Sequence, residues 1–389
     1  MRGPGRSLVM SAMETGTAVC VVRSDTYPIY IGDPLDKALC AVMAQARAVH
    51  GTARAHVISD PVVAGLYLPA VRAVAASTGL ALTRHVLPAG EGAKSAPVLC
   101  DLWAGMHHSG VDRRTLIVGL GGGAVCDVAT LAAATYMRGL PYVLIPTTLM
   151  AQADAAIGGK GGVDFAGVKN LVGAFYHPAA VVVDPALLGT LDSRQLRNGM
   201  AEIIKIAVIS DADLFERIES GAANGTGPAS DLTPLVQQAI RRKLELLAAD
   251  PFERDSLARP LNYGHCVGHA LEAASDFAIP HGEAVAAGMA MAASVGVAAG
   301  HCSAADLRRI LALLARYRLP VTIPRSLRAG SWLRMREIRR IRNGLLHLVV
   351  PSGLGACSII ADIDEAAYRA ALDRLDRWCP APADGPRRW

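Results

Sequence analysis

Three histidines lie close together in one apolar stretch of the chain, and their spacing suits metal binding or acid–base chemistry. His265 and His269 are four residues apart, about one turn of a helix, and His281 follows after a short gap. Imidazole is the commonest metal ligand in proteins, and it titrates near neutral pH. Three unrelated surface residues are the simplest alternative, because the chain has 11 histidines. That alternative is weak, since His281 opens a long apolar segment.

A carboxylate and a lysine on another expected helix can complete such a site. Glu202 and Lys205 are three residues apart, so they share one face of a helix expected over 194–209. Their neighbours are apolar, which favours a buried ion pair over a surface pair. One carboxylate and two imidazoles make a three-ligand zinc set that leaves one coordination position for a substrate. The spacing alone does not decide which two histidines join Glu202.

A glycine-rich segment indicates a nucleotide site. Residues 119–127, Gly-Leu-Gly-Gly-Gly-Ala-Val-Cys-Asp, follow an apolar run and open an alanine-rich stretch. Such glycines let the backbone approach a pyrophosphate at a helix N-terminus. The segment departs from the usual dinucleotide fingerprint, because Ala124 replaces the last glycine and no acidic residue follows about 20 positions on. Asp60, after an earlier strand, is expected to hold the ribose instead. A glycine turn without a ligand is the less favoured alternative.

Composition narrows the class of protein. Hydrophobic residues make up 52% of the 389 residues, and the formal net charge is +5. No basic run interleaves with aromatic residues, which argues against nucleic acid as a partner. The eight cysteines contain no Cys-x-x-Cys pair, and the first residues lack the apolar stretch of a signal peptide. We therefore expect a cytoplasmic enzyme, and we expect the uncharged segment 284–300 to be a buried helix rather than a membrane span.

The chain changes character near residue 185. Before it, four short β-branched runs alternate with helical stretches, which predicts a mostly parallel sheet. The expected strands are 55–58, 115–118, 142–145 and 180–183. After it, the pattern is mainly helical, with one small hairpin. The expected helices are 194–209, 231–249, 264–274, 282–300, 304–317 and 365–378, and the hairpin strands are 345–350 and 357–361. The pattern predicts an α/β dinucleotide-binding domain over 1–185 and a mainly α-helical metal and substrate domain over 186–389.

Several ordered motifs between residues 55 and 298 resemble the 3-dehydroquinate synthase family of sugar phosphate cyclases. Besides the glycine-rich segment, they include Leu-Pro-Ala-Gly-Glu-Gly-Ala-Lys at 87–94, Pro-Thr-Thr-Leu-Met-Ala-Gln-Ala-Asp at 146–154 and Lys-Asn-Leu-Val-Gly at 169–173. The Ala-Glu-Ile-Ile-Lys segment and the two histidine blocks complete the set. So many motifs in one order make a chance match very improbable. The resemblance implies a dehydroquinate synthase-like fold for both domains.

The resemblance also implies the roles of individual residues. It assigns Glu202, His265 and His281 to the metal, which is Zn²⁺ or Co²⁺, and His269 to the substrate. The implied NAD contacts are Asp60, Glu91, Lys94, Gly121, Gly122, Gly123, Asp127, Thr147, Thr148, Asp154, Lys160 and Lys169. The implied substrate and catalytic residues are Asp154, Lys160, Asn170, Lys205, Lys243, Asn262 and His269. Arg138 matches an arginine that such enzymes supply across a homodimer interface.

The implied reaction is that of a carbon–oxygen lyase acting on phosphates. A phosphorylated seven-carbon keto acid is oxidised by NAD, loses phosphate, is reduced again and closes into a carbocycle by an intramolecular aldol step. NAD is restored, so it acts as a catalyst. Aromatic amino acid biosynthesis through the shikimate pathway, or a secondary-metabolite pathway, would use such a product.

Three departures from the family pattern bear on the substrate. Ala258 stands where the family has an arginine that grips the substrate carboxylate, Ile338-Arg339-Arg340 replaces Asp-Lys-Lys, and Cys266 replaces a threonine. We expect Arg259 and Arg340 to take over the carboxylate. The alternatives are an aminodehydroquinate synthase and a 2-deoxy-scyllo-inosose synthase, whereas Asn262 and His269 weigh against the valiolone-synthase branch. From another class, an NAD-dependent polyol dehydrogenase of the glycerol-dehydrogenase type is disfavoured by Lys160, Lys205 and Lys243.

Overall fold

The chain forms two compact units, each assembled from two separate segments. In this computed structural model, the described residues are 17–22, 25–221, 232–248, 250–253, 260–341 and 343–378. The first unit combines Met1–Leu191 with Asp231–Phe252, and the second combines Asp192–Ser230 with Glu253–Trp389. The predicted boundary at residue 185 therefore needs correction, because the helix that follows residue 231 packs within the first unit. Lys243 of that helix forms an ion pair with Asp154 of the first segment.

A twisted sheet forms the core of the first unit. In the described part of the chain, seven strands follow the order β1-β2-β9-β6-β5-β3-β4. They are β1 (Thr17–Val22), β2 (Asp25–Ile31), β3 (Arg54–Ser59), β4 (Ala81–Val86), β5 (Leu116–Gly121), β6 (Tyr142–Pro146) and β9 (Ala180–Val183). All neighbours run parallel except β1, which is antiparallel to β2. The mostly parallel sheet that the sequence predicts is thus confirmed.

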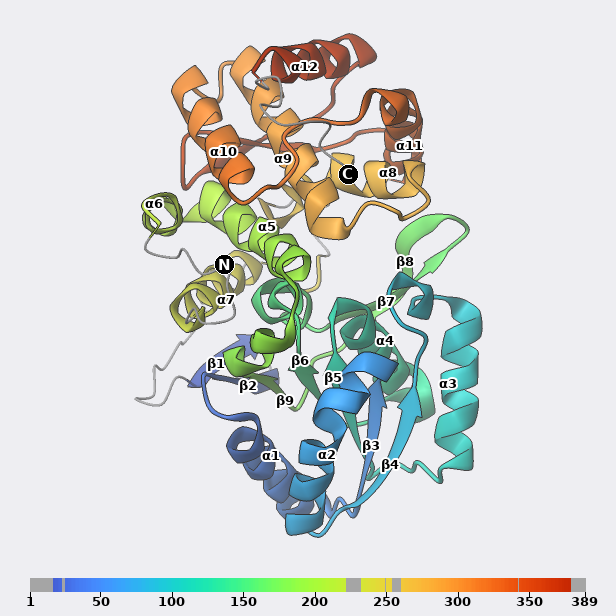
Figure 1. Cartoon of the computed structure of the whole chain (residues 1–389). Helices are drawn as coiled ribbons and strands as arrows, with labels where there is room; N and C mark the ends of the chain where they lie inside the picture. Colours follow the sequence, from blue (N-terminus) through green and yellow to red (C-terminus); the bar gives the residue numbers. More distant parts are fainter. Residues whose placement is uncertain are drawn as a thin grey trace, which may run out of the picture. The chain divides into compact units, whose positions relative to one another are not determined.

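Helices cover both faces of this sheet (Figure 1). They are α1 (Leu35–His50), α2 (Pro61–Ser77), α3 (Ala96–His108) and α4 (Gly123–Thr135). Alternate strand residues such as Val57 and Val118 belong to one apolar core with α1 and α2. On the other face Gly119 lies so near α4 that an added Cβ would be 2.8 Å from the Cβ of Ala129. Burial on both faces explains why the strands read as short, almost wholly apolar runs.

The carboxyl ends of the parallel strands carry several of the predicted site residues. Asp60 follows β3, Gly122 follows β5, and Thr147 follows β6. Ligands of open α/β sheets bind at this edge. The connections between the strands and helices contain three further elements. They are a 3₁₀ turn (Glu91–Ala93), a π-helical turn (Ala151–Ala155) and an antiparallel hairpin of β7 (Lys160–Phe165) and β8 (Val168–Phe175). Helix α7 (Thr233–Leu247) contacts the π-helical turn.

The second unit is built around one buried helix. Its helices are α5 (Ser193–Ser210), α6 (Ala212–Glu219), α8 (His265–Ala274), α9 (His281–Ala298), α10 (Ala304–Arg316), α11 (Arg328–Ile341) and α12 (Glu365–Trp378), with a hairpin of β10 (Leu348–Pro351) and β11 (Cys357–Ile360). Helices α5, α8, α10 and α12 all pack on α9 (Figure 1). The prediction of a buried helix over 284–300 is confirmed for residues 284–296, whereas residues 298–300 at its end are exposed. Within the described ranges, no helix is long and apolar enough to cross a membrane.

Candidate active site

The turn from β5 to α4 has the form of a phosphate cradle. Gly122 is the N-cap of α4 and offers no side-chain acceptor to the first N–H groups of the helix. Gly121 must be small, because an added Cβ would lie 2.6 Å from the Cβ of Val125. The N–H of Thr147 donates to the carbonyl of Gly121 at 2.9 Å, which joins this turn to the end of β6. Helix N-termini of this kind bind phosphate, so the local geometry fits the pyrophosphate of a dinucleotide.

Asp60, which is predicted to bind a ribose, caps a helix in the structure. It is the N-cap of α2, and its Oδ1 accepts hydrogen bonds from the N–H groups of Val62 at 2.9 Å and Val63 at 3.0 Å. Pro61 at the first helical position supports the same helix start. Both bonds use one carboxylate oxygen. The contact with a ribose therefore stays a prediction.

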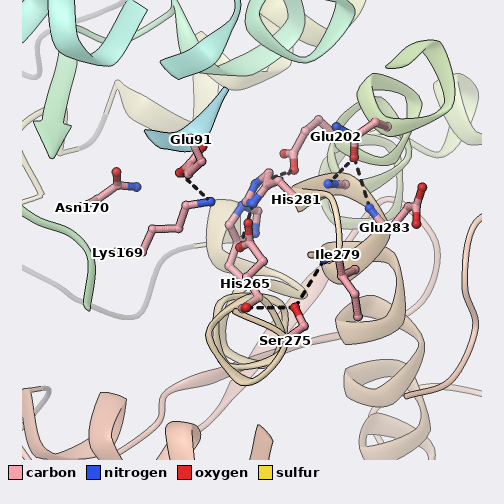
Figure 2. A network of polar contacts seen from close by, with 12 residues as sticks. Glu91, Lys169, Asn170, Glu202, His265, Ser275, Ile279, His281 and Glu283 are labelled. Carbon is pink, nitrogen blue, oxygen red and sulfur yellow. Dashed lines mark hydrogen bonds and ion pairs between the residues drawn. The ribbon is translucent and has the colours of Figure 1, made fainter. Parts of the chain in front are cut away.

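A buried lysine gathers the residues around the 3₁₀ turn. The Lys94 side chain is 4% exposed, and its Nζ lies 2.6 Å from Asp127 Oδ2 and also donates to Asn170 Oδ1. Glu91 Oε1 is 3.7 Å from Lys94 Nζ and 3.0 Å from Lys169 Nζ (Figure 2). Burial alone would lower the pKa of Lys94, but Asp127 and Glu91 outweigh it and hold that pKa above its usual value. The network joins four predicted cofactor residues to Asn170, which is predicted for the substrate.

A second ion pair lies at the π-helical turn after β6. Asp154 belongs to this turn, and Lys243 of α7 donates to its carbonyl oxygen at 2.6 Å and pairs with its carboxylate. Single π-helical turns are frequent at functional sites. Lys160 begins β7, and its Nζ lies 5.9 Å from the ring centroid of Phe175. The first unit thus holds Asp154 on the π-helical turn, Lys160 at the start of β7 and Lys243 on α7.

The second unit contains the carboxylate and histidine cluster. Glu202 is fully buried on α5, and its Oε2 lies 2.5 Å from Lys205 Nζ, which confirms the predicted buried pair. Glu202 Oε1 is 3.8 Å from His265 Nε2 and 3.5 Å from His281 Nε2. Figure 2 shows Glu202, His265 and His281 close to one another. Both distances are too long for hydrogen bonds.

Hydrogen bonds on the far side of each ring orient the two imidazoles. His265 Nδ1 is 3.1 Å from the carbonyl oxygen of Tyr263, and His281 Nδ1 is 3.1 Å from Glu272 Oε2. Each Nδ1 donates to an oxygen acceptor, so the Nε2 lone pair of each ring faces Glu202. Burial, followed by the charge of Lys205, lowers the pKa of His265 to about 4, so this ring is neutral at physiological pH.

These donors fit a tetrahedral divalent cation. Zinc holds nitrogen and oxygen ligands at about 2.0–2.2 Å, which places two such ligands roughly 3.3–3.5 Å apart at a tetrahedral angle. The 3.5 and 3.8 Å separations from Glu202 Oε1 are close to that value. Metal binding also requires neutral imidazoles and an ionised carboxylate.

His269 lies in the same cluster. It follows His265 by one turn of α8, and its ring centroid is 5.2 Å from that of His265 and 5.6 Å from that of His281. The nitrogens of the three histidines lie within 4.8 Å of one another. The structure therefore brings together all three histidines that the sequence singles out. The division into two ligands and one substrate contact remains the implication of the family resemblance.

Two contacts that position the start of α9 are not predictable from the sequence. Asn198 Oδ1 accepts from the N–H groups of Gly282 at 2.5 Å and Glu283 at 3.3 Å, so α5 caps α9. Arg194 forms a forked pair with Glu283, with distances of 2.6 and 3.0 Å. A side chain at Gly282 would collide with Asn198, because an added Cβ would lie 2.0 Å from its carbonyl oxygen. These contacts fix the start of α9, where His281 lies 3.5 Å from Glu202. A cap supplied by another helix cannot be recognised from local sequence.

Two arginines are expected to bind a substrate carboxylate, Arg259 and Arg340. Arg259 and Ala258 lie outside the described residues. Arg340 is exposed near the end of α11. Its neighbour Arg339 donates to Asp362 Oδ1 at 2.9 and 3.1 Å and to the carbonyl of Ile363 at 2.7 Å, so its charge is already compensated.

The remaining predicted residues of the second unit lie beside the histidines. Asn262 ends a short 3₁₀ turn (Pro260–Asn262) three residues before His265. Cys266 is buried, and its thiol donates to the carbonyl of Leu346 at 3.5 Å.

Comparison with known sequences identifies the family. Residues 84–198 match the family model "3-dehydroquinate synthase N-terminal" and residues 199–337 match "3-dehydroquinate synthase C-terminal". The 2-epi-valiolone synthase of Stigmatella aurantiaca is 42% identical over 98% of this chain and 96% of its own length. The 3-dehydroquinate synthase of Symbiobacterium thermophilum is 40% identical over 91% of this chain and 99% of its own. The chain belongs to the 3-dehydroquinate synthase family of sugar phosphate cyclases.

Solved structures support the same fold and supply cofactor information. The 2-epi-5-epi-valiolone synthase ValA from Streptomyces hygroscopicus subsp. jinggangensis 5008, with NAD⁺ and Zn²⁺ bound, matches with a TM-score of 0.83 and 29% identity over 93% of this chain and 99% of that one. A 2-deoxy-scyllo-inosose synthase complexed with carbaglucose-6-phosphate, NAD⁺ and Co²⁺ matches with a TM-score of 0.78 and 26% identity over 92% and 99%. The prediction of a dehydroquinate synthase-like fold is confirmed. The argument from Asn262 and His269 against the valiolone-synthase branch loses its force, because valiolone synthases are among the most similar proteins.

Proposed function

We propose that this protein is a metal- and NAD-dependent cyclase that converts a heptulose phosphate into a carbocycle with release of phosphate. The observation that carries the proposal is the convergence of Glu202, His265 Nε2 and His281 Nε2 beside the buried Lys205. Solved relatives that bind NAD⁺ with Zn²⁺ or Co²⁺ support the choice of cofactors. The proposal keeps the predicted reaction and changes the predicted substrate from a phosphorylated keto acid to a ketose phosphate without a carboxylate.

The residues take the following proposed roles. Glu202, His265 and His281 hold the metal, and the turn at Gly122 with Thr147 holds the pyrophosphate of NAD. When bound, NAD would exchange a hydride with the substrate, and the metal would polarise the substrate oxygen. Lys160, Lys205 and Lys243 are the predicted contacts for the phosphate and its developing charge.

The choice against a carboxylate rests on three observations. Ala258 occupies the position of the family's carboxylate-binding arginine. Arg339 is compensated by Asp362, and Arg340 is exposed. The relative that is 42% identical over nearly the whole chain bears the name 2-epi-valiolone synthase. A buried carboxylate without a partner is costly, so a site without the arginine favours a substrate without a carboxylate.

A seven-carbon keto acid, as used by 3-dehydroquinate synthases, is the second candidate. Retention of Asn262 and His269 and the 40% identity with a 3-dehydroquinate synthase favour it. In that case Arg259 would have to bind the carboxylate.

A substrate panel tests the proposal. We expect phosphate release from a heptulose phosphate with a kcat/KM about 10- to 100-fold above that for the corresponding heptulosonate phosphate, because the acid lacks a charge-assisted contact worth about 1.5–3 kcal/mol. Aminoheptulosonate phosphate and glucose 6-phosphate complete the panel. Preference for the acid, together with a loss of that activity in Arg259→Ala, would assign the protein to the second candidate.

We further propose a homodimer in which Arg138 reaches the partner's site. Arg138 is exposed at the end of a strained turn, where Met137, Arg138 and Gly139 have φ values of 50°, 68° and 124°. Residues other than glycine rarely adopt such values, at a cost of roughly 1–2 kcal/mol each. Strain of this kind persists where the direction of a side chain matters.

A mixed dimer tests the contribution of Arg138. Arg138→Ala should lower kcat/KM about 10- to 100-fold through loss of a charged contact with the phosphate, while the exposed Arg113→Ala should not. Coexpression of Arg138→Ala with Glu202→Gln should restore up to about one quarter of the wild-type sites, because half of the dimers then contain one complete site. Absence of any recovery in a confirmed heterodimer would show that Arg138 does not act across the interface.

A further inference from the structure

We propose that Glu272 is a positioning residue for the metal site, acting through the ring of His281. The inference rests on the metal binding proposed above, but it concerns a residue that has no assigned part in the reaction. Glu272 lies in the last turns of α8 and is 2% exposed. Its Oε2 lies 3.1 Å from His281 Nδ1, across nine residues of sequence and on a different helix.

The burial of the Glu272 carboxylate indicates that it has a specific role in the structure. An ionised carboxylate away from water is strongly unfavourable unless it is paired and hydrogen-bonded. The hydrogen bond to His281 supplies such a partner. The same helix carries His265 at its first residue, so α8 provides one imidazole directly and orients a second one that belongs to α9.

The backbone of His281 is held independently of its ring. Asn198 of α5 caps the start of α9 through Gly282 and Glu283. The imidazole could still turn about its side-chain bonds and exchange the places of Nδ1 and Nε2. A carboxylate at Nδ1 removes that freedom, because it selects the tautomer with the proton on Nδ1 and leaves the Nε2 lone pair facing Glu202 at 3.5 Å.

The two imidazoles differ in the acceptor behind them. His265 Nδ1 faces the neutral carbonyl of Tyr263, whereas His281 Nδ1 faces the carboxylate of Glu272. A carboxylate raises the basicity of an imidazole ligand more than a neutral acceptor does. His281 should therefore be the stronger of the two nitrogen donors to the metal, and Glu272 should act on affinity as well as on orientation.

Metal titration of the full-length apoprotein tests this role. Zinc affinity, measured by competition with a chromophoric chelator, should fall about 10- to 100-fold in Glu272→Gln, which keeps the shape and one acceptor oxygen but removes the charge. Glu272→Ala should lose more, because the ring is then free to turn. The matched control is Glu219→Gln, which removes a carboxylate from another ion pair of the same unit, that with Arg309; its zinc affinity should stay within about twofold of wild type.

Cobalt gives a second readout that a purely structural role would not change. The visible absorption of Co²⁺ bound to Glu272→Gln should shift in position or intensity from that of the wild type, because one ligand changes its orientation and basicity. Zinc affinity within twofold of wild type and an unchanged cobalt spectrum in Glu272→Gln would overturn the proposal. His281→Ala separates the two levels: if it too binds zinc normally, the metal assignment itself is wrong, and not only the role of Glu272.

Discussion

Glu202→Gln should reduce turnover by about 10³-fold or more and release the metal. Glu202 Oε1 lies within 4 Å of both His265 Nε2 and His281 Nε2. Its amide replacement is a poor metal ligand, and a bound metal is worth several kcal/mol of transition-state stabilisation. At about 1.4 kcal/mol per tenfold, that corresponds to the stated loss. The measurements are kcat and metal content of the purified variant.

The same substitution also removes the counter-charge of Lys205, so folding has to be separated from metal binding. An uncompensated buried ammonium destabilises by about 3–5 kcal/mol. The double variant Glu202→Gln/Lys205→Met should recover much of that stability and still bind no metal. A Glu202→Gln variant with full metal content and normal kcat would contradict the assignment of Glu202.

Lys94→Met should destabilise the first unit by about 3–5 kcal/mol and weaken NAD binding. Lys94 is 4% exposed and lies 2.6 Å from Asp127, so its removal leaves this largely buried carboxylate without its nearest charge partner. Burial already raises the pKa of Asp127. Asn170 loses the donor to its side-chain oxygen at the same time. Urea unfolding and NAD titration give the two quantities.

An exposed ion pair of the same unit provides the control for Lys94. Lys37 is 68% exposed and lies 2.9 Å from Asp33, so Lys37→Met should cost no more than about 1 kcal/mol. A free energy of unfolding for Lys94→Met within 1 kcal/mol of the wild type would mean that the buried network contributes little to the fold.

Much of the fold follows from local patterns in the sequence. The parallel strands β3, β5, β6 and β9 and the helix α9 contain runs of mostly apolar residues, and such runs can be recognised in the sequence alone. The placement of α7 is not visible in this way. Its sequence has the pattern of a helix like those after it, and its place in the first unit depends on contacts with residues distant in sequence, such as the pairing of Lys243 with Asp154, 89 residues earlier.

In the site, too, some residues can be recognised from their spacing in the sequence, whereas others are brought together only by folding. Glu202 and Lys205 are recognisable because three positions on a helix place them on one face. Glu272 and Asn198 act on the start of α9 from two other helices, so their partners are fixed by packing rather than by spacing. Asp60 shows a third case, since an acidic residue after a strand suits both a ribose and a helix cap, and the structure assigns it the cap.

The balance of NAD during turnover tests the central claim most directly. A cyclase restores NAD within each cycle, so phosphate release from a heptulose phosphate should require NAD, exceed the enzyme concentration many times and leave no net NADH. The measurement follows inorganic phosphate and the absorbance of NADH in the same reaction. Many turnovers of phosphate without accumulated NADH are the predicted result. NADH formed in proportion to consumed substrate, without phosphate release, would contradict the account and indicate a polyol dehydrogenase.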